Sequence, residues 1–179
     1  MNNMQLSDIK VLFSEDKIKL RLKELAEEIN NFYNGEDLCV ISVLKGSVIF
    51  ATDLVRLLNM PLTMEFVRLS SYGNSTSSDG KIKPLYIDLP DLNDKNVLIV
   101  EDIVDTGYTA KYIIDYLGSK YNTKSTKLVS FFNKKIKRQV QIEPDFYAFD
   151  IDNRFIVGYG LDYAGLYRNL SFVGYKELY

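Results

Sequence analysis

Three carboxylates stand close together in the stretch "VLIVEDIVDTGYTA", which covers residues 97–110. Glu101, Asp102 and Asp105 come directly after four apolar residues that predict a buried strand. Like charges repel one another at such a place, so we expect a bound group there that favours negative charge. A divalent cation, sugar hydroxyls or a cationic intermediate would meet that requirement.

The residues that follow these acids have the character of a phosphate-binding turn. Thr106, Gly107 and Thr109 lie where the next helix should begin, and a helix N-terminus offers free N–H groups and a partial positive charge. A capped helix, with Asp105 or Thr106 as N-cap, would explain the same spacing. The chain has neither a GxxxxGK[ST] nor a GxGxxG motif. A sugar phosphate, which has anionic and hydroxyl groups, would satisfy both the turn and the acidic pair before it.

The elements around these residues predict an α/β fold, with a mostly parallel twisted sheet flanked by helices. Ligands bind at the carboxyl ends of the strands in such sheets, so the residues that follow three of the strands should meet there. We expect strands at residues 38–44, 62–69, 97–100 and 126–132, strand-like pieces at 145–151 and 154–162, and helices at 18–32 (N-cap Ser14, end Gly35), 48–58 and 109–120 (end Gly118).

The composition predicts a single globular domain over residues 1–179 and excludes several kinds of site. Hydrophobic residues make up 46% of the chain, and the net charge of −2 argues against nucleic acid as a partner. The chain has no histidine, so acid–base chemistry must use Asp, Glu, Lys or Tyr. Its single cysteine, Cys39, suits a buried thiol in a reducing compartment. No signal-like start or membrane-length apolar run is present, so we expect a soluble cytoplasmic protein without a membrane partner.

A long polar segment, "SSYGNSTSSDGK" at residues 70–81, separates two of the apolar regions. It has two interpretations. A solvated hairpin connection would have this composition, and so would a mobile lid over a binding site.

Several motifs carry a resemblance to a known family. "VLIVEDIVDTGYT" resembles the phosphoribosyl-pyrophosphate-binding motif of type I phosphoribosyltransferases. "LKGSVIFATDL" is similar to the LKGG segment of the hypoxanthine–guanine members, and "SSYGN" resembles their mobile Ser-Tyr loop. "PDFYAFDIDNRFIVGYGLDYAGLYRNL" resembles their purine-binding C-terminal region. The resemblance implies a Rossmann-like core, a mobile loop at about residues 70–83, a small hood from the N-terminus and about residues 134–179, and a homodimer or homotetramer.

The resemblance also implies a reaction. The phosphoribosyl group of phosphoribosyl pyrophosphate would pass to N9 of hypoxanthine or guanine, giving IMP or GMP and pyrophosphate in purine salvage. Asp105 would be the catalytic base that takes the purine N7 proton. The residues implied to bind phosphoribosyl pyrophosphate are Lys45, Gly46, Glu101, Asp102, Asp105, Thr106, Gly107, Tyr108, Thr109 and Arg168.

Other residues receive their roles from the same resemblance. Arg138 is a candidate for a pyrophosphate contact, and Arg154 stands where many relatives have lysine. The peptide before Lys45 is often cis in the family. Ser47 replaces the usual second glycine, although serine tolerates a positive φ poorly. The implied purine-binding residues are Lys134, Phe155, Ile156 and Asp162, the lid residues are Ser71 and Tyr72, and the Mg²⁺-binding residues are Glu101, Asp102 and Asp162.

Three other interpretations remain open at this point. The same fold could serve xanthine or a pyrimidine, although the Lys134 and Phe155 region favours a 6-oxopurine. It could belong to an RNA-binding regulator, which the charge of −2 disfavours. It could also be a nucleotide-binding subunit without turnover.

Overall fold

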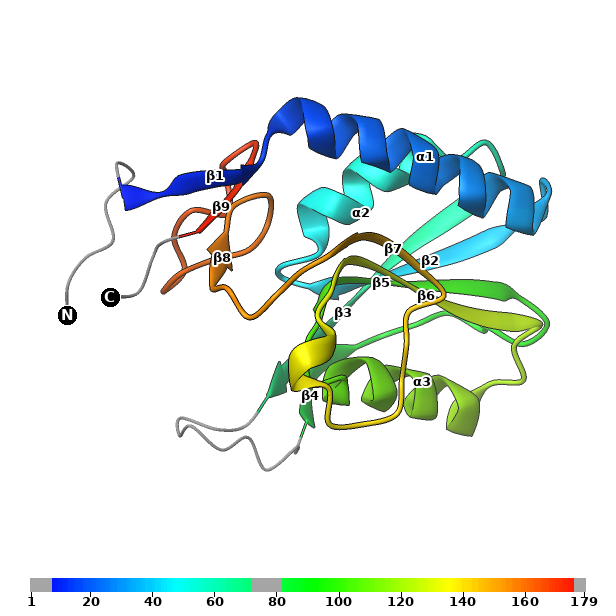
Figure 1. Cartoon of the computed structure of the whole chain (residues 1–179). Coiled ribbons are helices and arrows are strands. Elements are labelled where there is room, and N and C mark those ends of the chain that lie inside the picture. Colours follow the sequence, from blue (N-terminus) through cyan, green and yellow to red (C-terminus); the bar gives the residue numbers. More distant parts are fainter. Residues whose placement is uncertain (1–7, 72–81, 176–179) are drawn as a thin grey trace.

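The structure, a computed structural model, describes residues 8–71 and 82–175 and has a mixed main sheet (Figure 1). This sheet has six strands in the order β4-β3-β2-β5-β6-β7, and all neighbours are parallel except β3 and β4. The predicted fold class is therefore confirmed. The elements are β1 (Lys10–Phe13), α1 (Glu15–Tyr33), β2 (Leu38–Leu44), α2 (Val48–Val55), β3 (Leu62–Ser71), β4 (Ile82–Ile87), β5 (Asn96–Val104), α3 (Tyr108–Lys120), β6 (Ser125–Asn133), a 3₁₀ turn (Lys135–Lys137), β7 (Phe146–Asp150), β8 (Ile156–Val157) and β9 (Val173–Tyr175).

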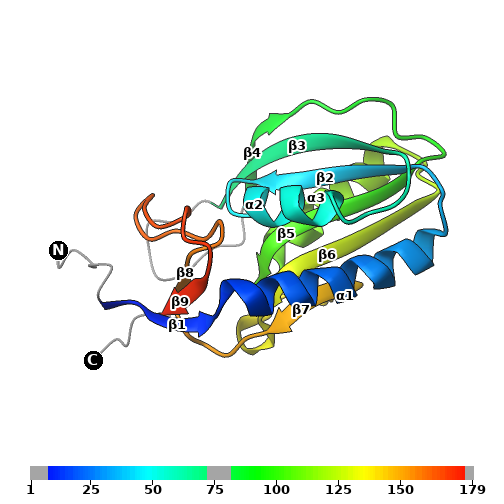
Figure 2. The same cartoon turned by 90° about the horizontal axis from the view of Figure 1, so that it is seen from above.

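Helices cover both faces of the main sheet, α1 and α2 on one side and α3 on the other (Figures 1 and 2). Successive side chains of a strand point to opposite faces, and β5 follows this rule. Leu98 and Val100 join the apolar cluster beneath α1 and α2, whereas Val97 and Ile99 join the cluster beneath α3. Burial on both faces explains why this strand is a continuous apolar run in the sequence.

Some predicted boundaries are confirmed and others are wrong. The Ser14 Oγ accepts a hydrogen bond from the Lys17 N–H at 3.3 Å, which confirms the N-cap of α1. Asn34, in the left-handed conformation, caps the other end of α1 in place of Gly35. Gly118 lies inside α3 instead of ending it, and α2 stops at Val55. The exposed strand β4 was not predicted at all, because only its two end residues are even partly buried.

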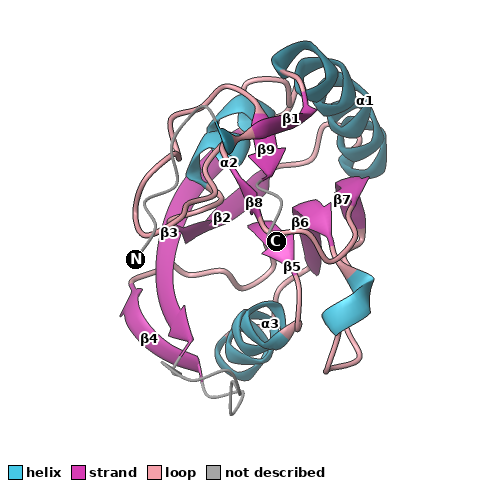
Figure 3. Ribbon diagram, turned by 60° about the vertical axis from the view of Figure 1, so that its left-hand side comes forward, coloured by secondary structure: helices cyan, strands magenta, loops and turns pink. Residues whose placement is uncertain are grey.

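A second, three-stranded sheet in the order β1-β9-β8 joins the two ends of the chain (Figure 3). Strand β1 comes from the N-terminal part of the predicted hood, and strands β8 and β9 come from the part of the chain after β7. The predicted hood began at about residue 134, but Phe146–Asp150 pairs with β6 as the edge strand of the main sheet. None of the helices in the described part of the chain has the length and apolar content that a membrane span requires.

Phe131 on β6 connects the two sheets through a group of aromatic rings. Its ring centroid lies 5.2 Å from that of Phe50 on α2, 5.6 Å from that of Phe149 on β7 and 4.8 Å from that of Tyr159 after β8. The side chain is fully buried. This one residue therefore packs against a helix, the main sheet and the segment that joins β8 to β9 in the small sheet.

We predict that Phe131→Ala lowers the free energy of unfolding by about 3–5 kcal/mol, because it leaves a cavity among these rings. Leu20→Ala is the control, because Leu20 is 61% exposed on α1, and it should change stability by no more than about 0.5 kcal/mol. Urea denaturation measures both variants. Equal effects of the two substitutions would contradict this account of the core.

Candidate active site

A cavity lies where the chain leaves two neighbouring parallel strands in opposite directions. β2 leads into α2 on one face of the main sheet, and β5 leads into α3 on the other (Figure 2). Such a divergence opens a crevice at the carboxyl ends of the strands. The cavity has a volume of about 570 Å³. Of the residues predicted to form the site, Lys45, Gly46, Glu101, Asp102, Asp105, Thr106, Gly107, Thr109, Asp162 and Arg168 line it.

The remaining predicted site residues are not among those that line the cavity. Lys134 is buried directly after β6, whereas Tyr108 is the first residue of α3. Ile156 is buried in β8. Phe155 is 43% exposed, and its ring meets the ring of Tyr163 edge-on, so it does not line this cavity. Ser71 ends β3 as a backbone position, while Tyr72 lies outside the described residues, as does most of the predicted loop at 70–83.

Glu101 and Asp102 lie within β5, because the strand continues to Val104 rather than ending at Val100 as predicted. Burial raises the pKa of Glu101 well above its ordinary value, and the neighbouring charge of Asp102 raises it further. Burial also raises the pKa of Asp102, although a hydrogen bond from the Ile103 N–H and the nearby Arg168 act in the opposite direction. The ionised pair therefore has too few compensating partners in the protein alone, and it suits a cation or sugar hydroxyls.

Gly46 is required by its closeness to Asp102. A Cβ atom at residue 46 would lie 1.4 Å from Asp102 Oδ2, well inside contact distance. Serine is compatible with the next position, where the family usually has a second glycine, because Ser47 has a φ of −75°. Its hydroxyl donates to the Val43 carbonyl oxygen at 2.6 Å, and the Leu44–Lys45 peptide is cis.

Asp162 and Arg168 reach the cavity from the segment after β8. Arg168 donates to the Gly160 carbonyl oxygen at 2.6 Å, and its other terminal nitrogen lies 2.6 Å from Asp162 Oδ1. A Cβ at residue 160 would lie 2.1 Å from the Gly46 carbonyl oxygen. This segment is therefore packed directly against the turn after β2, and it fixes both side chains.

The turn after β5 leaves the N-terminus of α3 open. The N-cap is Gly107, with φ 87°, and no side chain caps the helix. The interpretation with Asp105 or Thr106 as N-cap is therefore wrong, and the first N–H groups of α3 are free to meet an anion. A Cβ at residue 107 would lie 2.7 Å from Cγ2 of both Val140 and Ile142. The glycine is therefore needed because another segment of the chain packs behind the turn.

The Asp105 carboxylate is buried on one side and faces a lysine on the other. Its Oδ1 accepts no hydrogen bond from any described residue. Its Oδ2 lies 3.5 Å from Nζ of Lys134, a side chain that is only 8% exposed. A buried acceptor without a donor is costly, so a ligand that brings an N–H group would stabilise this arrangement.

Three arginines differ from what the sequence led us to expect. Arg68 was missed, yet it lines the cavity from within β3, where it pairs with Leu44 of β2. Arg68 could have been found from the sequence, because it stands near the carboxyl end of the strand predicted at residues 62–69. Arg138 was a candidate for a pyrophosphate contact, but its guanidinium is bonded to the backbone behind the turn. Arg154 pairs with Asp152 at 2.8 Å and lies over the ring of Tyr175, away from the cavity lining.

The predicted Mg²⁺ ligands fit a metal site in which the protein and the bound substrate both supply oxygens. Glu101, Asp102 and Asp162 line the same cavity, and their oxygens are the ligands that Mg²⁺ prefers. Across residues 8–71 and 82–175, however, no three such side chains come close enough to form a complete metal-binding group. This arrangement fits a cation that takes one or two carboxylates from the protein and further oxygens from a bound phosphate compound.

Comparison with known proteins agrees with this fold. Residues 9–164 match the model of the phosphoribosyl transferase domain, so the chain belongs to that family. It is 39% identical over 165 residues to the hypoxanthine-guanine phosphoribosyltransferase of Bacillus subtilis (strain 168), which covers 92% of this chain and 91% of that protein. A crystal structure of a hypoxanthine phosphoribosyltransferase from Staphylococcus aureus superposes with a TM-score of 0.91 at 35% identity, covering 99% of this chain and 96% of the other.

A longer relative contains the same unit. The chain is 42% identical over 175 residues to the bifunctional protein TilS/HprT of Listeria monocytogenes serotype 4b (strain F2365). The match covers 97% of this chain but only 27% of that protein, so the chain spans about a quarter of the length of this relative.

Gly107 is required both by its positive φ and by the close packing behind it, and three Gly→Ala substitutions separate these two effects. Gly118 has open space and no positive φ, so Gly118→Ala should raise the free energy of unfolding by about 0.5–1 kcal/mol. Gly35 has open space and φ +81°, so Gly35→Ala should lower it by about 1–2 kcal/mol. Gly107→Ala adds crowding to a positive φ and should lower it further. Urea denaturation measures the series, and an equal loss at residues 35 and 107 would show that the packing behind the turn is unimportant.

Proposed function

We propose that this chain transfers the phosphoribosyl group of phosphoribosyl pyrophosphate to N9 of hypoxanthine or guanine. IMP or GMP and pyrophosphate are the products, and the reaction serves purine salvage in the cytoplasm. The chain acts as one phosphoribosyltransferase domain with the small sheet as its hood, and it assembles as a homodimer or homotetramer. The observation that carries this proposal is the pair of Asp105 and Lys134. One buried oxygen of Asp105 has no donor among the described residues, and Lys134 lies beside the other oxygen.

The pair matches one edge of a 6-oxopurine. N7–H and O6 of such a base lie side by side, one a donor and the other an acceptor. The Asp105 carboxylate accepts from N7–H, and the Lys134 ammonium, which has only donors, bonds to O6. A 6-aminopurine presents a donor at that position and would leave the lysine unsatisfied. The same pair therefore supplies the catalytic base and the selection of the base substrate.

In the reaction, N9 forms a bond to C1′ of the ribose, and the bond from C1′ to the pyrophosphate oxygen breaks. Pyrophosphate leaves with the electron pair of that bond, and the N7 proton passes to Asp105. The transition state resembles an oxocarbenium ion, which nearby carboxylates stabilise. Phe155 and the backbone of Ile156 hold the purine, and closure by Ser71 and Tyr72 excludes water.

The other end of the cavity suits the charged substrate. The turn at residues 105–109 holds the 5′-phosphate through backbone and hydroxyl donors at the open N-terminus of α3. Lys45, Gly46, Arg68 and Arg168 take the pyrophosphate. Glu101 and Asp102 accept from the ribose hydroxyls.

Mg²⁺ would be held by Asp102 and Asp162, with Glu101 nearby, and by oxygens of the substrate. When bound, the ion offsets the negative charge that develops on the leaving pyrophosphate. Asp162 is also paired with Arg168, so both side chains would meet the pyrophosphate end of the substrate.

Asp105→Asn should lower kcat with hypoxanthine by about 10²-fold to 10⁴-fold, because an amide cannot take the N7 proton. The KM for phosphoribosyl pyrophosphate should change little, because the backbone of the turn is unaltered. Asp115→Asn is the matched control, because Asp115 lies exposed on α3, outside the cavity lining, and pairs with Lys111 at 2.8 Å. Steady-state measurement of pyrophosphate release gives both constants. Turnover within about threefold of the original chain would show that Asp105 is not the base.

A panel of four bases tests the substrate class. Hypoxanthine and guanine should be converted, and adenine should not. The rate with xanthine shows whether the site accepts an oxygen at position 2 of the purine. Removing divalent cations with a chelator should abolish turnover, and added Mg²⁺ should restore it. Conversion of adenine at the rate of hypoxanthine would contradict the role of Lys134, and no conversion of any base would contradict the proposed function.

A further inference from the structure

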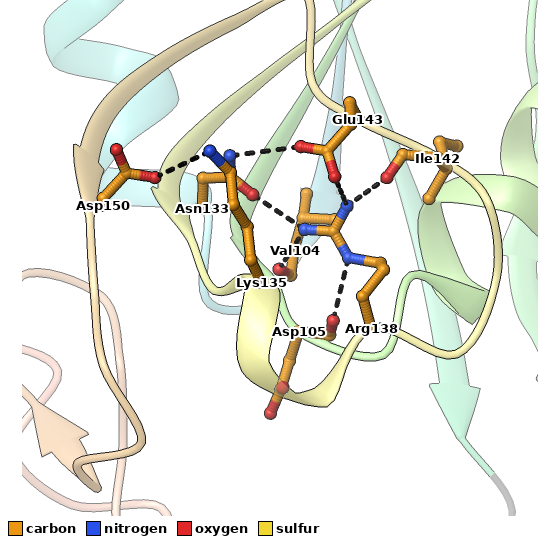
Figure 4. A network of polar contacts seen from close by, with 8 residues as sticks. All are labelled: Val104, Asp105, Asn133, Lys135, Arg138, Ile142, Glu143 and Asp150. Atoms are coloured by element: carbon orange, nitrogen blue, oxygen red, sulfur yellow. Dashed lines mark hydrogen bonds and ion pairs between the residues drawn. The ribbon is translucent and has the colours of Figure 1, made fainter.

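Arg138 is a nearly buried arginine that is not among the residues lining the cavity, and it bonds to the backbone behind that lining. Its side chain is 11% exposed. Nε donates to the Asp105 carbonyl oxygen at 3.1 Å, and Nη2 donates to the Val104 carbonyl oxygen at 3.0 Å and to Asn133 Oδ1 at 2.7 Å. Nη1 donates to the Ile142 carbonyl oxygen and to Glu143 Oε1. The five N–H donors of the guanidinium are thus all used (Figure 4).

These bonds belong to a larger contact between residues 138–142 and the phosphate-binding turn. The N–H groups of Gln139 and Val140 both donate to the Thr106 carbonyl oxygen, at 3.0 and 3.3 Å. Together with Arg138, they hold three successive carbonyl oxygens, those of residues 104, 105 and 106. The turn is therefore fixed from behind by one short segment of the chain.

Holding these carbonyl groups determines where the amide groups point. In a planar trans peptide, the N–H points opposite to the C=O of the same unit. The N–H groups of Asp105, Thr106 and Gly107 therefore point away from Arg138, and these three residues line the cavity. The Asp105 carboxylate also extends away from the guanidinium (Figure 4).

We propose that Arg138 is a positioning residue for the phosphate-binding turn, an inference that rests on the proposed function. By holding the carbonyl groups of Val104 and Asp105, it directs the turn's amide groups at the 5′-phosphate of the substrate. It acts only through the backbone and does not touch the substrate.

The geometry requires arginine at this position. A guanidinium is a rigid planar fork, so it can donate to both carbonyl groups and to Asn133 at once. Lysine keeps the charge but has a single nitrogen at the end of a flexible stem, and it cannot reproduce this pattern. Glu143 is 60% exposed and lies at the outer end of the network, so it is a lesser contributor.

Arg138→Met and Arg138→Lys test the proposal in the full chain. Both should raise the KM for phosphoribosyl pyrophosphate by about tenfold or more, since a small misplacement of binding groups has large effects. The KM for hypoxanthine should change by less than about threefold, because hypoxanthine has no phosphate. If Arg138→Met does not fold, Arg138→Lys, which keeps the charge and most of the stem, supplies the measurement.

Arg21→Met is the matched control. Arg21 is also partly buried and donates to two backbone carbonyl oxygens, those of Tyr147 and Ala148, each at 2.9 Å. It joins α1 to β7 outside the cavity lining, so its loss should reduce stability and leave both KM values unchanged. An equal shift in Arg21→Met, or a KM for phosphoribosyl pyrophosphate in the Arg138 variants within about threefold of the original, would overturn the proposal.

Binding measurements separate this inference from the proposed function. Calorimetry with IMP and with inosine compares ligands that differ in the 5′-phosphate alone. The Arg138 variants should lose about tenfold or more in affinity for IMP and much less for inosine. If the original chain binds IMP but does not turn over, the proposed function fails while the role of Arg138 is still tested. Equal losses for both ligands would overturn the role of Arg138.

Discussion

Negative charge at the carboxyl end of β5 is the constraint on which the rest of the site depends. Glu101 and Asp102 are held within the strand, Asp105 follows directly, and Asp162 reaches the same cavity from beyond β8. Such a group is stable only with cations nearby, and the chain supplies them from separate places in the sequence. Lys134 follows β6, Arg168 comes from the segment against the small sheet, and Lys45 follows β2. A substrate with phosphates, hydroxyl groups and an N–H completes the balance, which explains why acids and cations alternate around one cavity.

Two close backbone approaches keep this arrangement in place. The turn after β2 lies between Asp102 and Gly160, and it leaves no space for a Cβ at Gly46 or at Gly160. The turn after β5 lies against residues 138–142, and it leaves no space for a Cβ at Gly107. Both turns are thus set by packing within the protein before any ligand arrives. Preorganised donors lose little freedom on binding, which favours both affinity and catalysis.

The α/β class and the acids and turn after β5 could be predicted from the sequence because they are local features. The resemblance to the family, and not local spacing, implied the other predicted residues that line the cavity, which are Lys45, Gly46, Asp162 and Arg168. Apolar runs mark buried parallel strands, and the acids and the threonine–glycine turn are adjacent in the chain. Features that depend on distant contacts were not predictable. Strand β4 is mostly exposed and lacks a clear pattern, and Arg138 lies in "NKKIKR", which has the composition of a solvated basic edge. The continuation of β5 through Glu101 and Asp102 was missed because two adjacent charges inside a buried strand are unfavourable unless a site requires them.

The central claim is that Asp105 and Lys134 together bind one edge of a 6-oxopurine. The most direct test is a crystal structure of the chain with IMP. The account predicts purine N7 within hydrogen-bonding distance of the Asp105 carboxylate, at about 2.6–3.2 Å, and O6 within the same distance of Lys134 Nζ. The phosphate should lie on the turn at residues 105–109. A nucleotide bound with its phosphate on this turn but its purine directed away from Asp105 and Lys134 would contradict the claim.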